Sequence, residues 1–159
     1  MKHSVEVGLS FGLTSGVITT IGLMVGVYSS TESSIAVIAS VLTIAIADAM
    51  SDALGIHIAE ESENVHTKQE VWVATLTTFF AKFTVSCTFL IALFLLDLKT
   101  AVIVNIVWGS ILMVIYNYYV GKKQKQKTWS VILEHLFIAF LVVLITYFMG
   151  QVVQSYIET

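Results

Sequence analysis

Two aspartates lie four residues apart in an otherwise apolar stretch of the chain. In the segment AIADAMSDALGIHIAEES, residues 45–62, mainly small and aliphatic side chains surround Asp48 and Asp52. At about 100° per residue, an α-helix places these two carboxylates only about 40° apart, on one face. Carboxylate oxygens are hard ligands, which suit Mg²⁺, Ca²⁺, Mn²⁺ or Fe²⁺ better than copper. The spacing therefore predicts a site for a divalent cation.

The elements that carry these side chains are predicted to be membrane-spanning helices. The chain has 159 residues, of which 57% are hydrophobic and 12% charged, a balance too apolar for a soluble domain. Runs of about 20 apolar residues cross the ~30 Å hydrocarbon layer, and long unbroken runs favour helices over a barrel. Five such runs cover residues 7–28, 34–60, 71–96, 100–120 and 129–153. The predicted fold is one all-α integral membrane domain over residues 1–159 with five transmembrane helices.

The lysines between the runs predict the orientation in the membrane. One side of a five-span chain holds only Lys99, whereas the other side holds Lys2, Lys68, Lys122, Lys123, Lys125 and Lys127, and the chain has no Arg. The positive-inside rule places the lysine-rich side and the N-terminus in the cytosol, and the C-terminus outside. The stretch KKQKQK is thus a topology anchor facing the lipid bilayer, and no nucleic-acid partner is expected.

Ionised aspartates at this depth require compensation. An Asp near the bilayer centre costs on the order of 2.5 to 3.5 kcal/mol on insertion scales. Three interpretations of Asp48 and Asp52 remain open. In the first, the two aspartates form a hydrogen-bonded pair that joins helices. In the second, they form a salt bridge to Lys82, which lies at a similar depth to Asp48. In the third, they line a path for a divalent cation, and Lys82 is a counter-charge that the substrate displaces.

Other ionisable residues gather near the predicted cytosolic boundary. Glu60 and Glu63 lie on or beside the stripe of Asp48 and Asp52 and are candidate metal ligands, although a solvated loop also explains this acidic cluster. His57 and His66 are possible entry ligands, and His57 also fits an interfacial hydrogen bond. In the fifth run, Glu134 is a candidate proton relay or second-helix ligand, with capping or packing as the alternative.

Glycines in the first run recur at helical spacing. Gly12 and Gly16 are four residues apart, as are Gly22 and Gly26. Small residues at this spacing allow close approach of two helix backbones in lipid, so the pattern predicts a packing interface. A cavity lined by backbone carbonyls and hydroxyls is the alternative, and both fit a subunit interface.

Three stretches resemble the vacuolar iron transporter family, the proton-coupled exporters of Fe²⁺ and Mn²⁺. They are SGVITTIGLMVGV (15–27), ADAMSDALGIHIAEES (47–62) and ILEHLFIAFLVVLITYFMGQ (132–151), and they occur in matching order along the chain. The resemblance implies a homodimer, with a metal path between the first and second helices of the two subunits. It also agrees with five spans and a cytosolic N-terminus.

The chain departs from this family at the positions of the usual ligands. The acid of the family's first span falls on Ser15, its metal-binding methionine on Asp52, and two of its glutamates on Ile44 and Ile56. The long helical metal-binding insert between spans two and three is replaced by the short linker ENVHTKQE. The resemblance thus carries the fold further than the substrate.

These observations predict a transporter that moves divalent cations out of the cytosol in exchange for protons. The ion is a transported substrate and no permanently bound cofactor is expected. The expected location is the plasma membrane of a prokaryote. An intramembrane aspartyl hydrolase is disfavoured because both aspartates lie on one helix with no deep acid on another, so no enzyme is expected. The alternative is a non-transporting scaffold in which Asp48 and Lys82 form a closed ion pair.

Overall fold

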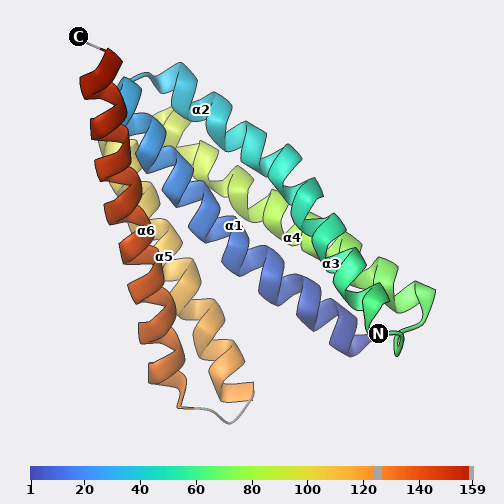
Figure 1. The fold of residues 1–159 in the computed structure, drawn as a ribbon. Helices are drawn as coiled ribbons and strands as arrows, with labels where there is room; N and C mark the ends of the chain where they lie inside the picture. The colour runs from blue at the N-terminus through green and yellow to red at the C-terminus, as the bar shows by residue number, and fades with distance from the viewer. Residues whose placement is uncertain (124–126, 158–159) are drawn as a thin grey trace.

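The computed structural model describes residues 1–123 and 127–157, which are almost entirely helical (Figure 1). In chain order the elements are α1 (Lys2–Thr31), α2 (Ser34–Thr43), the π-helical turn η1 (Ile44–Asp48), α3 (Ala49–Ser62), α4 (Lys68–Leu95), α5 (Leu98–Lys123) and α6 (Thr128–Ile157). Since α2, η1 and α3 are continuous, the described residues contain five helices of membrane-spanning length and composition. The all-α class and the five predicted helices are confirmed, and most helices extend a few residues beyond the apolar runs.

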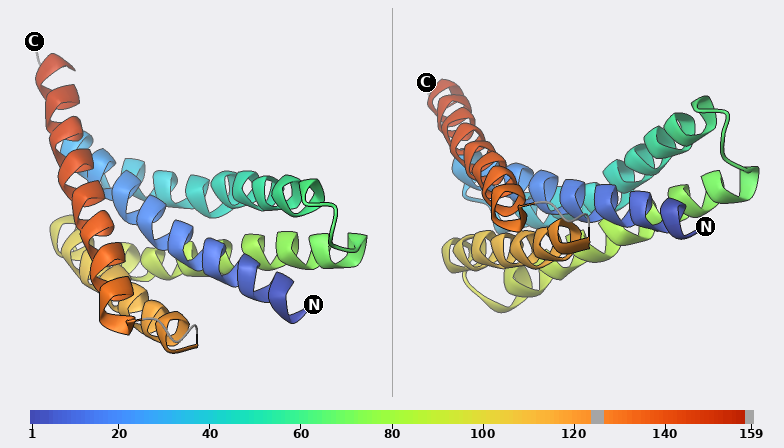
Figure 2. Two further views of the ribbon diagram at one scale, coloured as in Figure 1. Left: turned by 60° about the horizontal axis from the view of Figure 1, so that its bottom comes forward. Right: turned by 90° about the horizontal axis from the view of Figure 1, so that it is seen from below.

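Helix α1 lies at the centre of the arrangement. It runs between α6 and the continuous span formed by α2, η1 and α3, with α4 and α5 behind it (Figure 1). Two further views show α3 diverging from α5 and α6 toward the end where the chain begins (Figure 2). Because the chain passes through the bundle five times, the N- and C-termini lie at opposite ends. Lys2 and Lys68 lie at the N-terminal end and Lys99 at the opposite end, while Lys125 falls outside the described residues.

The first half of the glycine stripe packs against α4. A Cβ added at Gly12 would lie 2.6 Å from the carbonyl oxygen of Thr78, and one at Gly16 would lie 3.3 Å from the Cα of Lys82. Side chains at these positions would therefore force the two backbones apart. This close approach brings α1 directly beside the segment of α4 that carries Lys82.

The second half of the stripe packs against a different helix. A Cβ at Gly22 would lie 2.7 Å from Cγ1 of Val142 on α6, and one at Gly26 would lie 3.6 Å from Cβ of Thr146. The prediction of a packing role for the glycines is thus confirmed. One stripe serves two partners within the same chain, because α4 crosses its first half and α6 its second half.

The second span contains a wide turn that the sequence did not predict. The chain contains no Pro, and residues 44–48 nevertheless form a π-helical turn that ends at Asp48. Every fourth residue of this span is buried, at Val41, Ala45, Ala49 and Ala53. In a regular α-helix, side chains four residues apart differ in direction around the helix axis by about 40°. A turn with more residues than an α-helical turn reduces this difference, so that the row stays on one face.

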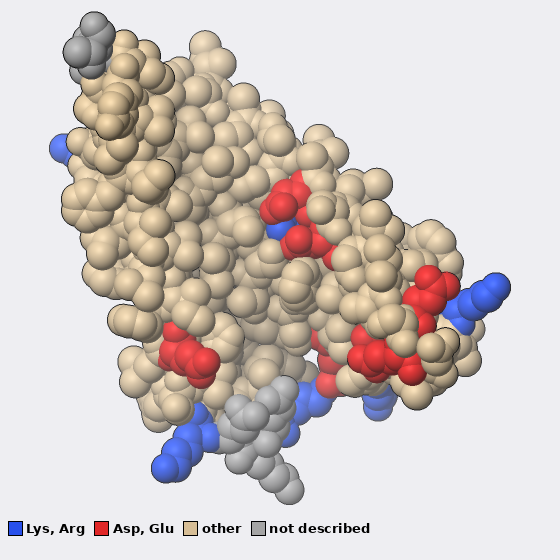
Figure 3. Space-filling view, viewed as in Figure 1, with Lys and Arg blue, Asp and Glu red and all other residues tan. Residues whose placement is uncertain are grey.

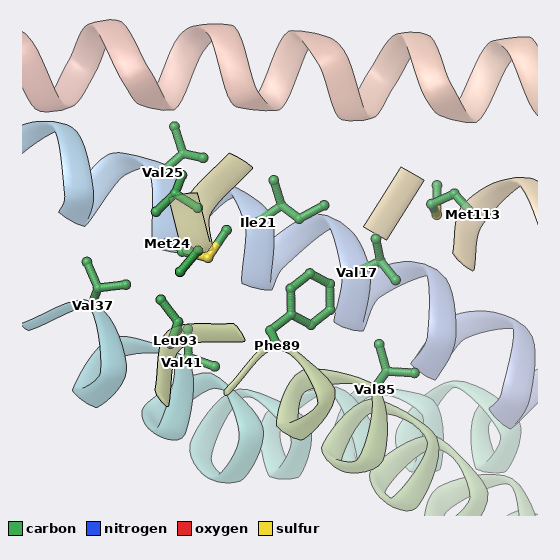
Figure 4. Close-up of a cluster of buried hydrophobic side chains, with 12 residues drawn as sticks. Val17, Ile21, Met24, Val25, Val37, Val41, Val85, Phe89, Leu93 and Met113 are labelled. Carbon is green, nitrogen blue, oxygen red and sulfur yellow. The ribbon is translucent and has the colours of Figure 1, made fainter. Parts of the chain in front are cut away.

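The hydrophobic core fills the half of the bundle toward the C-terminus of α1. Met24, Phe89, Val37 and Val41 are fully buried there, and Figure 4 shows these side chains from α1, α2 and α4 pointing toward one another. Asn105 on α5 donates a hydrogen bond of 2.9 Å to the carbonyl oxygen of Phe89 on α4 and fixes α5 to this core. On α4 the core extends as far as Val85, within one helical turn of Lys82.

Candidate cation site

Lys82 is the centre of a charged cluster within the bundle. Its side chain is 0% exposed, and its Nζ lies 2.5 Å from Oδ2 of Asp48 and 2.5 Å from Oδ2 of Asp52. The predicted salt bridge between Lys82 and Asp48 is confirmed, and Asp52 shares the same ammonium. Because burial makes an unpaired ammonium very costly, the two carboxylates account for the presence of this lysine at depth.

Ser15 on α1 completes the cluster. Its hydroxyl donates a hydrogen bond of 2.6 Å to Oδ2 of Asp52 and accepts one of 2.9 Å from Nζ of Lys82. Lys82 also donates a directed hydrogen bond to Asp52. Three helices therefore meet through one hydroxyl, one carboxylate and one ammonium. From the sequence, Ser15 was noted only as the residue that replaces the acid of the family's first span. Its position just before Gly16, where α1 and α4 approach closely, was the one feature of the sequence that indicated its hydrogen-bonding role.

The two aspartates differ in how firmly they are held. Asp52 is 20% exposed and hydrogen-bonded by both Ser15 and Lys82. Asp48 is 39% exposed, and its Oδ2 faces the ammonium at ion-pair distance without the directional geometry of a hydrogen bond. Asp52 is thus the structural partner of Lys82, while Asp48 is the carboxylate with fewer constraints.

Asp48 also opens onto a groove in the surface of the bundle. The groove has a volume of about 920 Å³ and lies between α1, η1, α3 and α6. In the space-filling view, acidic atoms surround a small basic patch within an uncharged surface beside α3 (Figure 3). With all three groups ionised, Asp48, Asp52 and Lys82 carry a net charge of −1. The cluster therefore retains unbalanced negative charge next to an accessible surface.

Local structure explains why Lys82 points inward at this depth. Helix α4 begins with a capping box, in which Thr67 Oγ1 accepts from the N–H of Glu70 at 3.3 Å and Glu70 Oε2 accepts from the N–H of Thr67 at 3.1 Å. From this fixed start, Thr78, Lys82 and Ser86 follow at four-residue spacing on the buried face. The close approach of Gly16 to Cα of Lys82 then holds this face of α4 against α1.

The predicted acidic ligands Glu60 and Glu63 lie elsewhere, near the end of α3. Glu60 is 6% exposed, and its Oε2 lies 3.6 Å from Nε2 of His66. Glu63 Oε2 lies 3.2 Å from the same imidazole nitrogen, and the His66 ring stacks on His3 at 5.9 Å between centroids. This group connects the beginning of α1 to the linker between α3 and α4.

The four predicted metal ligands therefore do not form one site. Across residues 1–123 and 127–157, no group of three or more His, Cys, Asp or Glu side chains is arranged to hold a metal ion. The prediction that Glu60 and Glu63 join Asp48 and Asp52 is wrong. The physical reason is rise along the axis, because Glu60 lies about 12 Å farther along the helix than Asp52 at about 1.5 Å per residue.

His57 and Glu134 also lie apart from the aspartates. Nδ1 of His57 is 2.9 Å from Oγ1 of Thr75 on α4, and its ring meets Trp72 edge-on at 4.8 Å. This geometry matches the interfacial hydrogen bond considered for His57. Glu134 is exposed on α6, a helix on the far side of α1 from α3 (Figure 1). The structure does not bring Glu134 to Lys82.

Comparison of the chain with models of protein families, with curated proteins and with solved structures gives no match. The functional interpretation therefore depends on the geometry of the cluster around Lys82.

Proposed function

We propose that this protein is a membrane transporter that moves divalent cations of the Fe²⁺ or Mn²⁺ type out of the cytosol in exchange for protons. One observation carries the proposal. Two carboxylates converge on a single buried ammonium, and one of the two, Asp48, also faces an open groove. A cluster used only to stabilise the bundle has no need for a second carboxylate exposed in this way.

The chemistry of the cluster suits exchange of one cation for another. Nζ of Lys82 lies at 2.5 Å from a carboxylate oxygen of Asp48 and of Asp52, so its ammonium would balance these carboxylates when no metal ion is bound. An arriving divalent ion supplies more positive charge than the ammonium that it displaces. Its binding to carboxylates favours release of protons from neighbouring groups, which couples metal and proton movement.

The ligand set of one chain is incomplete for such an ion. Asp48, Asp52 and the Ser15 hydroxyl supply fewer oxygens than the six or so that Mg²⁺ takes or the six to eight that Ca²⁺ takes. Water in the groove would supply the rest. The resemblance to the iron transporter family separately implies a homodimer.

Helix α3 offers a face for this dimer. Met50, Leu54 and Ile58 are exposed on it, and a Cβ added at Gly55 would meet no atom within 4 Å. Small residues on an exposed membrane helix allow another helix to approach closely. Disulfide cross-linking of Gly55→Cys, in a Cys87→Ser background, tests this contact, and a chain that stays monomeric in the membrane would contradict the dimer.

The lysine distribution supports a direction of transport. By the positive-inside rule, the lysines of the sequence near the N-terminus and between spans two and three and spans four and five favour a cytosolic N-terminal end. The cluster of Glu60, Glu63 and His66 lies at the same end. It provides negative charge that raises the local concentration of cations before they enter. We therefore propose export across the plasma membrane of a prokaryotic cell.

Transport is tested with purified protein in liposomes that contain a metal-quenched dye. We expect Mn²⁺ or Fe²⁺ to enter faster than in empty liposomes under a proton gradient, and Asp52→Asn to abolish the difference. Asp97→Asn is the matched control, because it makes the same change outside the helices and should leave transport intact. If the native protein moves none of Mn²⁺, Fe²⁺, Mg²⁺ or Ca²⁺, the transport proposal is wrong.

A second candidate function is a non-transporting membrane scaffold. The direct contact of Lys82 with both aspartates favours it, since a closed ion cluster can hold three helices together without moving anything. The double variant Asp48→Asn with Lys82→Met removes one charge of each sign. If this variant keeps all behaviour of the native protein, the scaffold interpretation replaces transport.

A further inference from the structure

The groove beside Asp48 combines an apolar surface with a single charged group. Its floor is the second half of α1, including Gly22 and Gly26, and its opposite wall includes Val142 and Met149 of α6. Among the residues that line it, Asp48 is the one charged side chain. The glycines keep the floor low, so that the groove follows α1 for several turns and ends near the carboxylate.

Size and charge together indicate what kind of molecule fits. The volume of about 920 Å³ falls in the range of roughly 300–1,000 Å³ typical of pockets for small molecules. Two carboxylates face the single ammonium of Lys82, so the acidic groups of the cluster outnumber the basic one and favour a positively charged ligand. An inorganic ion would gain nothing from the apolar walls, whereas an organic cation would bury its apolar groups there.

We propose that this groove binds amphipathic monovalent organic cations, with the positive charge at Asp48 and the apolar groups over the surface of α1, between α6 and η1. This ligand class differs from the divalent inorganic ions of the proposed function, and its binding requires no transport. The groove is also separate from the proposed dimer face, because Met50 and Leu54 do not line it. Charge complementarity at Asp48 selects this occupant over a neutral lipid chain.

Binding of radiolabelled tetraphenylphosphonium to the full chain in detergent tests the proposal. This cation cannot donate a hydrogen bond, so any dependence on Asp48 reflects charge. We expect saturable binding to the native protein and at least tenfold weaker binding to Asp48→Asn. Tetraphenylborate has nearly the same shape with a negative charge, and it should neither bind with comparable affinity nor compete. No metal or gradient is present, so the result is independent of the transport assay.

Two further variants locate the ligand. Ala47→Phe adds a ring at an exposed position that lines the groove, so it should weaken binding several-fold. Leu54→Phe is the matched control, since Leu54 is exposed on α3 outside the groove, and it should bind like the native protein. Gel filtration and thermal unfolding of each variant establish that it is folded.

The proposal is overturned by any of three results. The first is no saturable binding to the folded native protein, as expected if a second copy of the chain covers the groove. The second is equal affinity of native protein and Asp48→Asn, which would indicate partition into detergent. The third is loss of binding in Leu54→Phe with no change in Ala47→Phe, which would place the ligand on the other side of α3.

Discussion

Replacing Lys82 by Met tests the account of the charged cluster most severely. Methionine has a similar length and suits an apolar interior, so the substitution removes charge with little change of volume. It leaves Asp48 and Asp52 on one helix face, both formerly in contact with the same nitrogen at 2.5 Å. Removing one partner of a buried ion pair costs about 3–5 kcal/mol, because the remaining charge stays uncompensated. We expect a loss of this size in the free energy of unfolding.

The two aspartate variants should cost less, and in a defined order. Asp52→Asn weakens a hydrogen bond between charged groups inside the bundle, which is worth about 1.5–3 kcal/mol, and it leaves Lys82 with Asp48. Asp48→Asn removes a carboxylate that is 39% exposed and accepts no directed hydrogen bond. Because Lys82 keeps its hydrogen bond to Asp52 in this variant, the loss should be smaller than for Asp52→Asn. The predicted order of destabilisation is therefore Lys82→Met, then Asp52→Asn, then Asp48→Asn.

Unfolding by sodium dodecyl sulfate in mixed micelles, followed by circular dichroism, measures these differences. The double variant Lys82→Met with Asp52→Asn serves as the control, because it removes one charge of each sign and should recover part of the loss of Lys82→Met alone. The reasoning is refuted if Lys82→Met unfolds at the same detergent fraction as the native protein. A larger cost for Asp48→Asn than for Asp52→Asn would refute the assigned roles of the two carboxylates.

Three further predictions concern packing, positioning and pH. Gly12→Ala places a Cβ 2.6 Å from a backbone oxygen of α4 and should destabilise the bundle by about 1–3 kcal/mol. In the same unfolding assay Gly55→Ala, whose Cβ meets no atom within 4 Å, should stabilise the protein by up to about 1 kcal/mol, because Ala favours a helix interior more than Gly does. Ser15→Ala should reduce metal transport in liposomes while leaving a folded protein, because Asp52 loses the donor that orients it; unchanged transport would remove Ser15 from the site. The N–H of Thr100 donates to Asp97 at 3.0 Å and lowers the pKa of that carboxyl. The stabilising effect of this hydrogen bond is therefore complete above the unfolded pKa of about 3.9 and is lost as pH falls through the lower folded pKa. The difference in thermal unfolding between the native protein and Asp97→Asn should shrink as the pH is lowered from 6 to 3.

The sequence was sufficient to predict the helices and the contact between Lys82 and Asp48. Apolar runs of the required length indicate spans because every backbone polar group in a bilayer must be satisfied within the helix. Counting residues inward from each end then placed Lys82 and Asp48 at a similar depth, and their contact was confirmed. The four-residue spacing likewise placed Asp48 and Asp52 on one helix face.

The sequence could not show which helices meet, and several site predictions depended on that. Ser15 became part of the cluster because α1 crosses α4 at Gly16, a contact between residues 67 positions apart. Glu134 was excluded because α6 packs on the other side of α1 from α3. The π-helical turn before Asp48 was also invisible, since it depends on how α2 and α3 fit their neighbours. Residue type and helical period determine which segments are apolar and which side chains share one face of a helix. Packing in three dimensions decides which side chains from different helices come together.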